Sequence, residues 1–193
     1  MIHILGSGDL CKEFISFAKF TPSEVKIYSK SQIYEDDLKL SIAQNDKLFI
    51  AISDPTKRKR VFDHVSNIGL TPDTYIHPSV IIGQRTKIGI GCIIQPNVII
   101  SNDIVIKDSV FINCNTNIGH NVVIGNYSSL MVNISIGGHC QIGDNVLIGS
   151  GANLRPNIKV FSGTTIGIGS VVIRDILKGG SYFGNPAKLI YRK

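Results

Sequence analysis

The chain of 193 residues has no tryptophan, and aromatic side chains make up only 7% of it. No apolar run approaches the roughly 20 residues that a membrane-spanning helix needs, which excludes a transmembrane helix. The N-terminus has no basic stretch before its first apolar residues, which argues against a secretory signal peptide. These absences lead us to expect a cytoplasmic protein.

Cysteine is also scarce. The four cysteines are Cys11, Cys92, Cys114 and Cys140, and no two of them form a CxxC pair. A zinc ribbon is therefore not expected. Cys92 and Cys140 fall at a repeated position that otherwise holds small or β-branched residues, so we interpret them as reduced packing residues.

Charged residues make up 18% of the chain, hydrophobic residues 43%, and the formal net charge is +6, values typical of a globular protein. The basic residues cluster at Lys57-Arg58-Lys59-Arg60. This run is either a solvated helix face or a place where Arg58 or a neighbour meets a nucleotide phosphate. No aromatic residues interleave the charges, so we expect no nucleic-acid partner.

What the sequence has in abundance is a six-residue period. Residues 75–176 divide into seventeen consecutive blocks of six without an insertion, among them NIGHNV, VIGNYS and QIGDNV. The second residue of every block is aliphatic, from Ile76 to Val172, and the sixth is small or β-branched, from Val80 to Ile176. A short fixed period with an apolar residue in constant phase predicts a parallel β-helix.

In such a helix each block is a short strand and a turn, and three blocks make one triangular coil. We expect the second residues to stack inside the prism, where successive coils stabilise one another. Asparagine and glycine recur at the expected corners, where left-handed backbone conformations cost them least. The corner residues chosen on this basis are Asn97, Asn126, Asn145, Asn157, Gly143 and Gly149.

Residues 1–74 lack the period and predict a separate α/β domain. Apolar runs at 2–5, 25–28 and 48–52 predict three buried strands, and Pro55 can begin a helix. Gly6-Ser7-Gly8 follows the first strand and precedes a helical pattern, as in a Rossmann-type nucleotide-binding unit. The third glycine of that motif is absent. Residues 177–193 follow the last block and predict a C-terminal cap, since an open end would expose a sheet edge.

One residue of the array stands out as a candidate for chemistry. His120 is the fourth residue of NIGHNV and is expected to point outward, with Gly138 one coil further on. The array contains two other histidines, His77 and His139, and these three do not converge, so we expect no metal site. An outward imidazole suits general base catalysis, the alternative being a plain surface residue.

The hexad array, the GHNVVIGN segment and the terminal FGNPAK closely resemble the left-handed β-helix acyltransferases. Together with the N-terminal segment, including AISDPTKRKR and YIHPSVIIG, the chain resembles sugar acetyltransferases of the sialic-acid O-acetyltransferase type. That group includes the UDP-4-amino-sugar N-acetyltransferases. The resemblance covers essentially the whole chain.

The resemblance implies a homotrimer with acetyl-CoA in a groove between neighbouring β-helices, and it implies roles for particular residues. His120 would be the base, with Asn121 beside it. The implied contacts to a nucleotide-linked sugar are Gly6, Ser7, Gly8, Ser29, Lys30, Ser53, Asp54 and Asn113. The implied contacts to acetyl-CoA are Ser129, Gly138, Ser150 and Gly167.

The sequence departs from the family pattern at three places. Asn121 stands where the family has an acid, Asp9-Leu10 where a histidine is often found, and Ser129 where some members have a second histidine. An amide can orient the imidazole but supplies no charge. Since an amine needs less help from a base than a hydroxyl does, Asn121 favours N-acetylation.

We therefore expect an acetyl-CoA-dependent N-acetyltransferase for a UDP- or dTDP-linked 4-amino-4,6-dideoxy sugar in bacterial surface glycan synthesis. The alternatives are O-acetylation of a sugar such as sialic acid, a non-catalytic β-helix scaffold, and a nucleotide-dependent oxidoreductase. The last lacks the acidic residue expected for a ribose, since YSKSQ follows the second strand.

Overall fold

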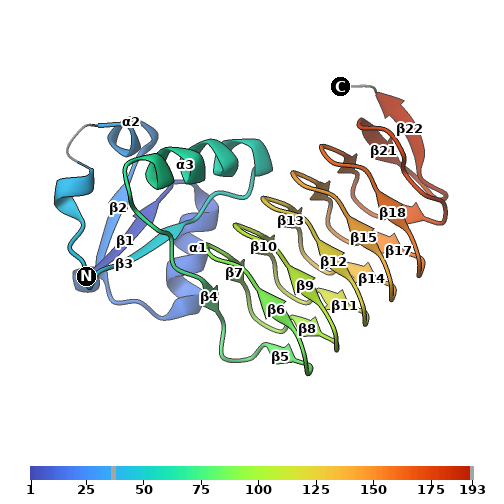
Figure 1. Ribbon diagram of the computed structural model, residues 1–193, viewed down its shortest axis with the longest axis horizontal. Helices are drawn as coiled ribbons and strands as arrows, with labels where there is room; N and C mark the ends of the chain where they lie inside the picture. Colours follow the sequence, from blue (N-terminus) through green and yellow to red (C-terminus); the bar gives the residue numbers. More distant parts are fainter. Residues whose placement is uncertain (36–37, 192–193) are drawn as a thin grey trace.

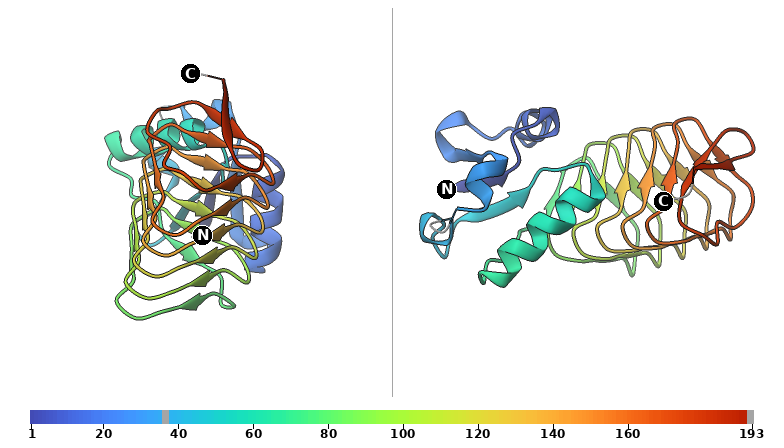
Figure 2. Two further views of the ribbon diagram at one scale, coloured as in Figure 1. Left: turned by 90° about the vertical axis from the view of Figure 1, so that its right-hand side faces the viewer. Right: turned by 90° about the horizontal axis from the view of Figure 1, so that it is seen from above.

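The computed structural model describes residues 1–35 and 38–191, which form two parts (Figure 1). An N-terminal α/β part is followed by a prism of short strands, and the two ends of the chain lie toward opposite ends of the molecule. Seen along its length, the prism is a stack of similar coils (Figure 2). Within the described residues, every helix is too short or too polar to cross a membrane.

The N-terminal sheet has three parallel strands in the order β2-β1-β3. The elements of this part are β1 (Ile2–Leu5), α1 (Asp9–Ala18), β2 (Val25–Tyr28), α2 (Lys30–Ile33), β3 (Lys47–Ile50) and α3 (Pro55–Asn67), with 3-10 turns at Pro22–Glu24 and Lys39–Ser41. The three predicted strands and the helix beginning at Pro55 are confirmed, whereas α2 was not expected. The Asp54 carboxylate caps α3 by accepting a hydrogen bond from the Lys57 backbone N–H at 2.8 Å.

The hexads form seventeen two-residue strands in three parallel sheets, and each strand from β4 to β17 pairs with the strand three further along the chain. Sheet 1 contains β4 (Tyr75–Ile76), β7 (Ile93–Ile94), β10 (Phe111–Ile112), β13 (Ser129–Leu130), β16 (Leu147–Ile148) and β19 (Thr165–Ile166). Sheet 2 contains β5 (Ile81–Ile82), β8 (Ile99–Ile100), β11 (Asn117–Ile118), β14 (Ser135–Ile136), β17 (Asn153–Leu154) and β20 (Val171–Val172). Sheet 3 contains β6 (Lys87–Ile88), β9 (Val105–Ile106), β12 (Val123–Ile124), β15 (Gln141–Ile142) and β18 (Lys159–Val160).

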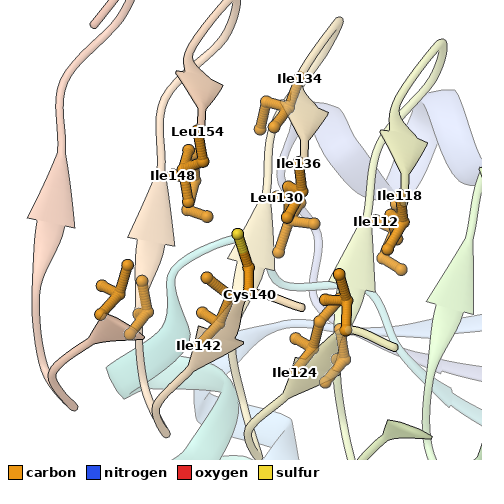
Figure 3. Packing of buried hydrophobic residues seen from close by; sticks show 14 of the residues in the cluster. Ile112, Ile118, Ile124, Leu130, Ile134, Ile136, Cys140, Ile142, Ile148 and Leu154 are labelled. Atoms are coloured by element: carbon orange, nitrogen blue, oxygen red, sulfur yellow. The ribbon is translucent and has the colours of Figure 1, made fainter. Parts of the chain in front are cut away.

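The prism interior is filled by the second and sixth residues of each hexad, as predicted (Figure 3). From Ile94 onward every second residue is buried. Ile76 and Ile82 are 37% and 41% exposed, because no earlier coil covers the first one. Two polar residues at the sixth position bond inside the prism: the hydroxyl of Thr116 and the thiol of Cys140 each donate to the carbonyl 15 residues on. The buried hydroxyl of Thr164, at the same position, has no partner among the described residues.

The corners turn at the fifth residue of the hexad, where φ is positive throughout the fifteen hexads of residues 81–170. Asn97, Asn145 and Asn157 occupy this position with φ of 59°, 57° and 65°, as predicted. The same prediction was wrong for Asn126, Gly143 and Gly149, which have no positive φ. The glycines are needed for a different reason: a Cβ on Gly143 would lie 2.6 Å from the Ser162 backbone nitrogen.

The N-terminal part packs against sheet 1. The outward side chains of Ile93 and Phe111 are buried beneath Phe14 of α1 and Phe49 of β3. In sheets 2 and 3 the corresponding residues, such as Asn117 and Gln141, are exposed. One face of the prism is thus covered by the chain itself and two faces are open.

Arg58 joins the two parts, and both sequence interpretations of this residue were wrong. It is 1% exposed, neither solvated nor free to meet a phosphate. Its guanidinium donates five hydrogen bonds, to the carbonyls of Ile52, Ser53, Ser109, Tyr127 and Ser128, the first two from the N-terminal part and the others from the prism. Burial lowers the pKa of Arg58 to about 9, so the group stays charged at neutral pH.

The C-terminal segment closes the far end of the prism. Strand β21 (Ser181–Phe183) pairs with β19 and then with the antiparallel β22 (Lys188–Tyr191). The Phe183 ring lies over Gly167, where an added Cβ would be only 1.9 Å from it. The tail therefore extends sheet 1 as the predicted cap and covers Gly167.

Candidate active site

His120 projects from the corner between sheets 2 and 3 and is exposed. Its Nδ1 lies 2.9 Å from the Asn121 side-chain oxygen. An amide oxygen only accepts hydrogen bonds, so this contact places the imidazole proton on Nδ1. The Nε2 lone pair is then free to accept a proton from a ligand.

Asn121 is the left-handed corner residue of its hexad, with φ of 58°. Asparagine, aspartate and glycine tolerate this conformation best, since other side chains crowd the backbone there. The residue that orients His120 is therefore also one that the turn favours. Its carbonyl partner is on the preceding coil, since the Asn121 N–H donates to the Asn102 carbonyl at 3.1 Å.

Gly138 lies beneath the His120 ring. A Cβ added at Gly138 would stand 2.8 Å from His120 Nε2, closer than Cβ contacts normally allow. Glycine leaves room here for the imidazole in its observed position, and the backbone does not call for glycine, since φ at Gly138 is not positive. The structure thus brings the predicted base and the predicted thioester-binding residue into contact.

The corner between sheets 3 and 1 shows what usually happens to the backbone N–H at the fourth hexad position. There, each N–H donates to a side chain on the next coil. The acceptors are Asp108 for Ile90, Asn126 for Asp108, Asp144 for Asn126 and Ser162 for Asp144. We call this series the amide ladder. It consumes every fourth-position N–H from Ile90 to Asp144.

At the corner that carries His120, between sheets 2 and 3, the corresponding series stops after one hydrogen bond. Gln84 donates to Asn102 at 2.9 Å, but no hydrogen-bond acceptor lies on the next coil for the backbone N–H groups of Asn102, His120 or Gly138 within the described residues. Gly138 has no side chain to accept a bond. Backbone N–H groups aimed outward at such a break are donors for a carbonyl or an oxyanion.

A second row of open donors follows the corner between sheets 1 and 2. The backbone N–H groups of Val132, Ser150 and Ile168 likewise have no acceptor in the part of the chain that the structure describes. They succeed one another at intervals of one coil. Ser150, predicted to contact acetyl-CoA, belongs to this row. Such spaced donors fit an extended ligand that carries several amide carbonyls.

The N-terminal part contains a pocket of about 580 Å³ at the carboxyl ends of its strands. Six predicted sugar-nucleotide residues line it together, namely Gly6, Ser7, Gly8, Lys30, Ser53 and Asp54. Ser29 does not line it: its hydroxyl caps α2 and lies 2.8 Å from Gln32 Oε1. Sequence reasoning missed Tyr34, Lys57 and Arg60, which also line the pocket. The basic run was the signal for the last two.

Three predicted site residues are not at an open surface of this chain. Asn113 is 4% exposed, and its side-chain oxygen accepts from the Cys114 N–H at 2.8 Å. Ser129 is fully buried, and its hydroxyl donates to the Ser53 carbonyl at 2.6 Å, so it joins the two parts of the chain. Gly167 lies under the Phe183 ring.

No acidic thiol nucleophile accompanies His120. Burial raises the pKa of all four cysteines, that of Cys92 to about 11. The charged neighbours on the His120 corner are Asp103 and Arg85, and the arginine holds the pKa of Asp103 below its ordinary value. Among residues 1–35 and 38–191, no three potential ligands gather to hold a metal ion.

No family model and no curated protein matches the sequence. The fold, however, is similar to several solved structures. The acetyltransferase domain of PglB from Neisseria gonorrhoeae has a TM-score of 0.89 at 23% identity, with 98% of each chain covered. PerB from Caulobacter crescentus, solved in complex with CoA and GDP-perosamine, has a TM-score of 0.71 at 24% identity, covering 98% of this chain and 96% of that one.

WeeI from Acinetobacter baumannii has a TM-score of 0.69 at 18% identity, covering 98% of this chain and 99% of the other. These likenesses extend over both parts of the molecule. They agree with the left-handed turn of the β-helix that the family resemblance implied. In fold, the chain is a left-handed parallel β-helix of hexapeptide repeats that carries an N-terminal α/β part.

Proposed function

We propose that this protein is an acetyl-CoA-dependent N-acetyltransferase that acts on a nucleotide-linked amino sugar. The observation that carries the proposal is that His120 Nε2 lies over Gly138, whose backbone N–H has no acceptor among the described residues. The fold likeness supports it, since PglB is described as an acetyltransferase and the Caulobacter enzyme as a GDP-perosamine N-acetyltransferase.

His120 is the general base in this proposal. Asn121 keeps the proton on Nδ1, so Nε2 takes the proton of the acceptor amine as its nitrogen bonds to the thioester carbon. The Gly138 N–H donates to the carbonyl oxygen as that oxygen gains negative charge. The carbon–sulfur bond then breaks, and His120 returns the proton to the departing thiolate. No acyl-enzyme forms.

The row of Val132, Ser150 and Ile168 is our proposed track for the pantetheine arm of acetyl-CoA, because that arm carries amide carbonyls. Gly167 precedes Ile168 of this row. Because the Phe183 ring covers Gly167, we assign the acetyl-CoA contact at this place to Phe183. Our proposed acetyl-CoA site does not include Ser129, because its buried hydroxyl already donates a hydrogen bond to the Ser53 carbonyl.

We further propose that the N-terminal part is a Rossmann-like domain and that its pocket holds the sugar nucleotide. Lys30, Lys57 and Arg60 surround the glycine turn and complement a diphosphate. The substrate we propose is a 4-amino-4,6-dideoxy sugar on UDP or dTDP, in bacterial surface glycan synthesis.

A homotrimer would bring the two sites together. Within one chain the N-terminal part covers sheet 1, whereas His120 lies at the corner between sheets 2 and 3, away from that face. A sugar bound in the pocket therefore needs the His120 corner of a neighbouring copy. The acetyl-CoA row at the corner between sheets 1 and 2 would then lie in the groove between copies.

The test is a His120→Ala variant assayed by thiol release with acetyl-CoA and a panel of UDP-, dTDP- and GDP-linked 4-amino sugars. We expect kcat to fall by about 10²- to 10⁴-fold. His77→Ala is the matched control, an array histidine whose Nδ1 is 2.8 Å from the Ser79 hydroxyl, and it should retain full activity.

Near-wild-type turnover by His120→Ala would contradict the proposal. Including sugars that offer a hydroxyl in place of the amine separates N- from O-acetylation. If acetyl-CoA at saturating concentration failed to raise the melting temperature, the chain would instead be a non-catalytic scaffold.

A further inference from the structure

His139 lies immediately after Gly138, one coil beyond Asn121, and its ring meets that of His120. The two ring centroids are 4.9 Å apart and the planes are perpendicular. One ring edge therefore faces the other ring, a preferred arrangement for aromatic pairs. His120 is thus contacted at Nδ1 by Asn121 and across its ring by His139.

The corner itself does not call for histidine at this position. His139 has a φ of 60°, a conformation that suits asparagine or glycine, and Asn121 and Asn157 hold the same position on the coils before and after. The corner's own hydrogen bond, from the His139 N–H to the His120 carbonyl at 2.8 Å, involves no side chain. The imidazole is therefore dispensable for the turn, and its contact is with His120.

A single hydrogen bond at Nδ1 leaves the His120 ring free to tilt about it. A second contact across the ring removes that freedom. Together the two contacts would hold the Nε2 edge over Gly138, where an added Cβ would lie 2.8 Å from Nε2. Two charged groups on the coils before His120, Arg85 and Asp103, pair with each other through two hydrogen bonds.

We propose that His139 is a positioning residue, which holds the His120 imidazole with its Nε2 edge over Gly138. Its ring, and not its nitrogens, performs this role. The consequence for turnover rests on the proposed function, in which His120 is the base. The positioning itself does not, so the two can be tested separately.

Two variants of the full chain distinguish the ring from its chemistry. His139→Asn removes the ring and suits the left-handed backbone. His139→Phe keeps a ring without nitrogens, and Tyr127 shows that an aromatic residue is accommodated at this hexad position with φ of 60°. Asn157→Gly, at the same corner one coil on, controls for changes to the corner.

The direct measurement is the nuclear Overhauser effect between the His120 ring proton on Cε1 and the Gly138 α-protons. We expect it to weaken at least threefold in His139→Asn and to persist in His139→Phe and Asn157→Gly. An unchanged effect in His139→Asn would overturn the inference.

Kinetics with acetyl-CoA and a competent amino sugar supply the second reading. We expect kcat to fall about tenfold in His139→Asn with KM nearly unchanged, and to recover in His139→Phe. A weakened Overhauser effect with unchanged kcat would support the positioning role and count against His120 as the base. Loss of kcat in both variants would overturn the claim that the ring alone matters.

Discussion

Two corners of the same prism differ in what happens to their backbone N–H groups. Between sheets 3 and 1, the side chains of Asp108, Asn126, Asp144 and Ser162 consume the backbone N–H groups of the preceding coils. Between sheets 2 and 3, His120 and Gly138 stand at the equivalent positions and leave those groups open. The backbone register is the same, so the fourth side chain decides whether the N–H of the preceding coil is bonded or open.

The closed corner is also the one that the chain covers. Arg58 and Tyr127 dock helix α3 on it, and Thr56 accepts a hydrogen bond from Asn145 there at 3.2 Å. The contacts of the N-terminal part among the described residues are with sheet 1 and with this corner, and not with the His120 corner. A repeat architecture can thus assign stability to one edge and chemistry to another by changing one residue per coil.

The largest effect expected is on the covered corner. Replacing Arg58 with leucine would leave the carbonyls of Ile52, Ser109 and Tyr127 without their guanidinium donor and remove a buried contact between the two parts. We expect the free energy of unfolding to fall by about 3 to 5 kcal/mol. Chemical denaturation measures this, and Arg60→Leu, an exposed neighbour on the same helix, is the control. Equal stability of the two variants would contradict the role given to Arg58.

A second test gives the open corner, between sheets 2 and 3, a side-chain acceptor like those of the closed corner. Gly138→Asp introduces an acceptor for the His120 backbone N–H, as Asp144 does for that of Asn126, and its Cβ displaces the His120 ring. We expect kcat to fall about 100-fold, since a displaced catalytic group can cost that much. The melting temperature should stay near that of the wild type, because the backbone at Gly138 has no positive φ. Retained turnover would show that catalysis depends neither on the position of the His120 ring nor on an open His120 N–H.

Removing one acceptor from the closed corner, between sheets 3 and 1, should have the smallest effect. Asn126→Ala removes the acceptor for the Asp108 N–H, a hydrogen bond of 3.1 Å. We expect a loss of about 1 kcal/mol in stability and no change in kcat. Asn126→Ser supplies a hydroxyl acceptor like that of Ser162 and should restore most of that loss. A loss of activity in Asn126→Ala would mean that the two corners are not independent.

Much of the candidate site was predictable because the hexad phase fixes which residues share a corner. His120 and Gly138 could be placed one coil apart from the sequence alone, and the structure brings them into contact. Ser129 shows where this reasoning ends. Its phase makes it an outward residue, yet it is buried because Ser53, 76 residues earlier, lies against it.

The sequence by itself determined the β-helix, its register and its inward residues, because each hexad repeats the same local pattern and each coil packs only on its neighbours. It also singled out His120. The tertiary structure decided which face of the prism would be covered. That choice rests on contacts such as Arg58 with Ser109 and Tyr127, which join positions 51 and 69 residues apart and leave no periodic trace in the sequence.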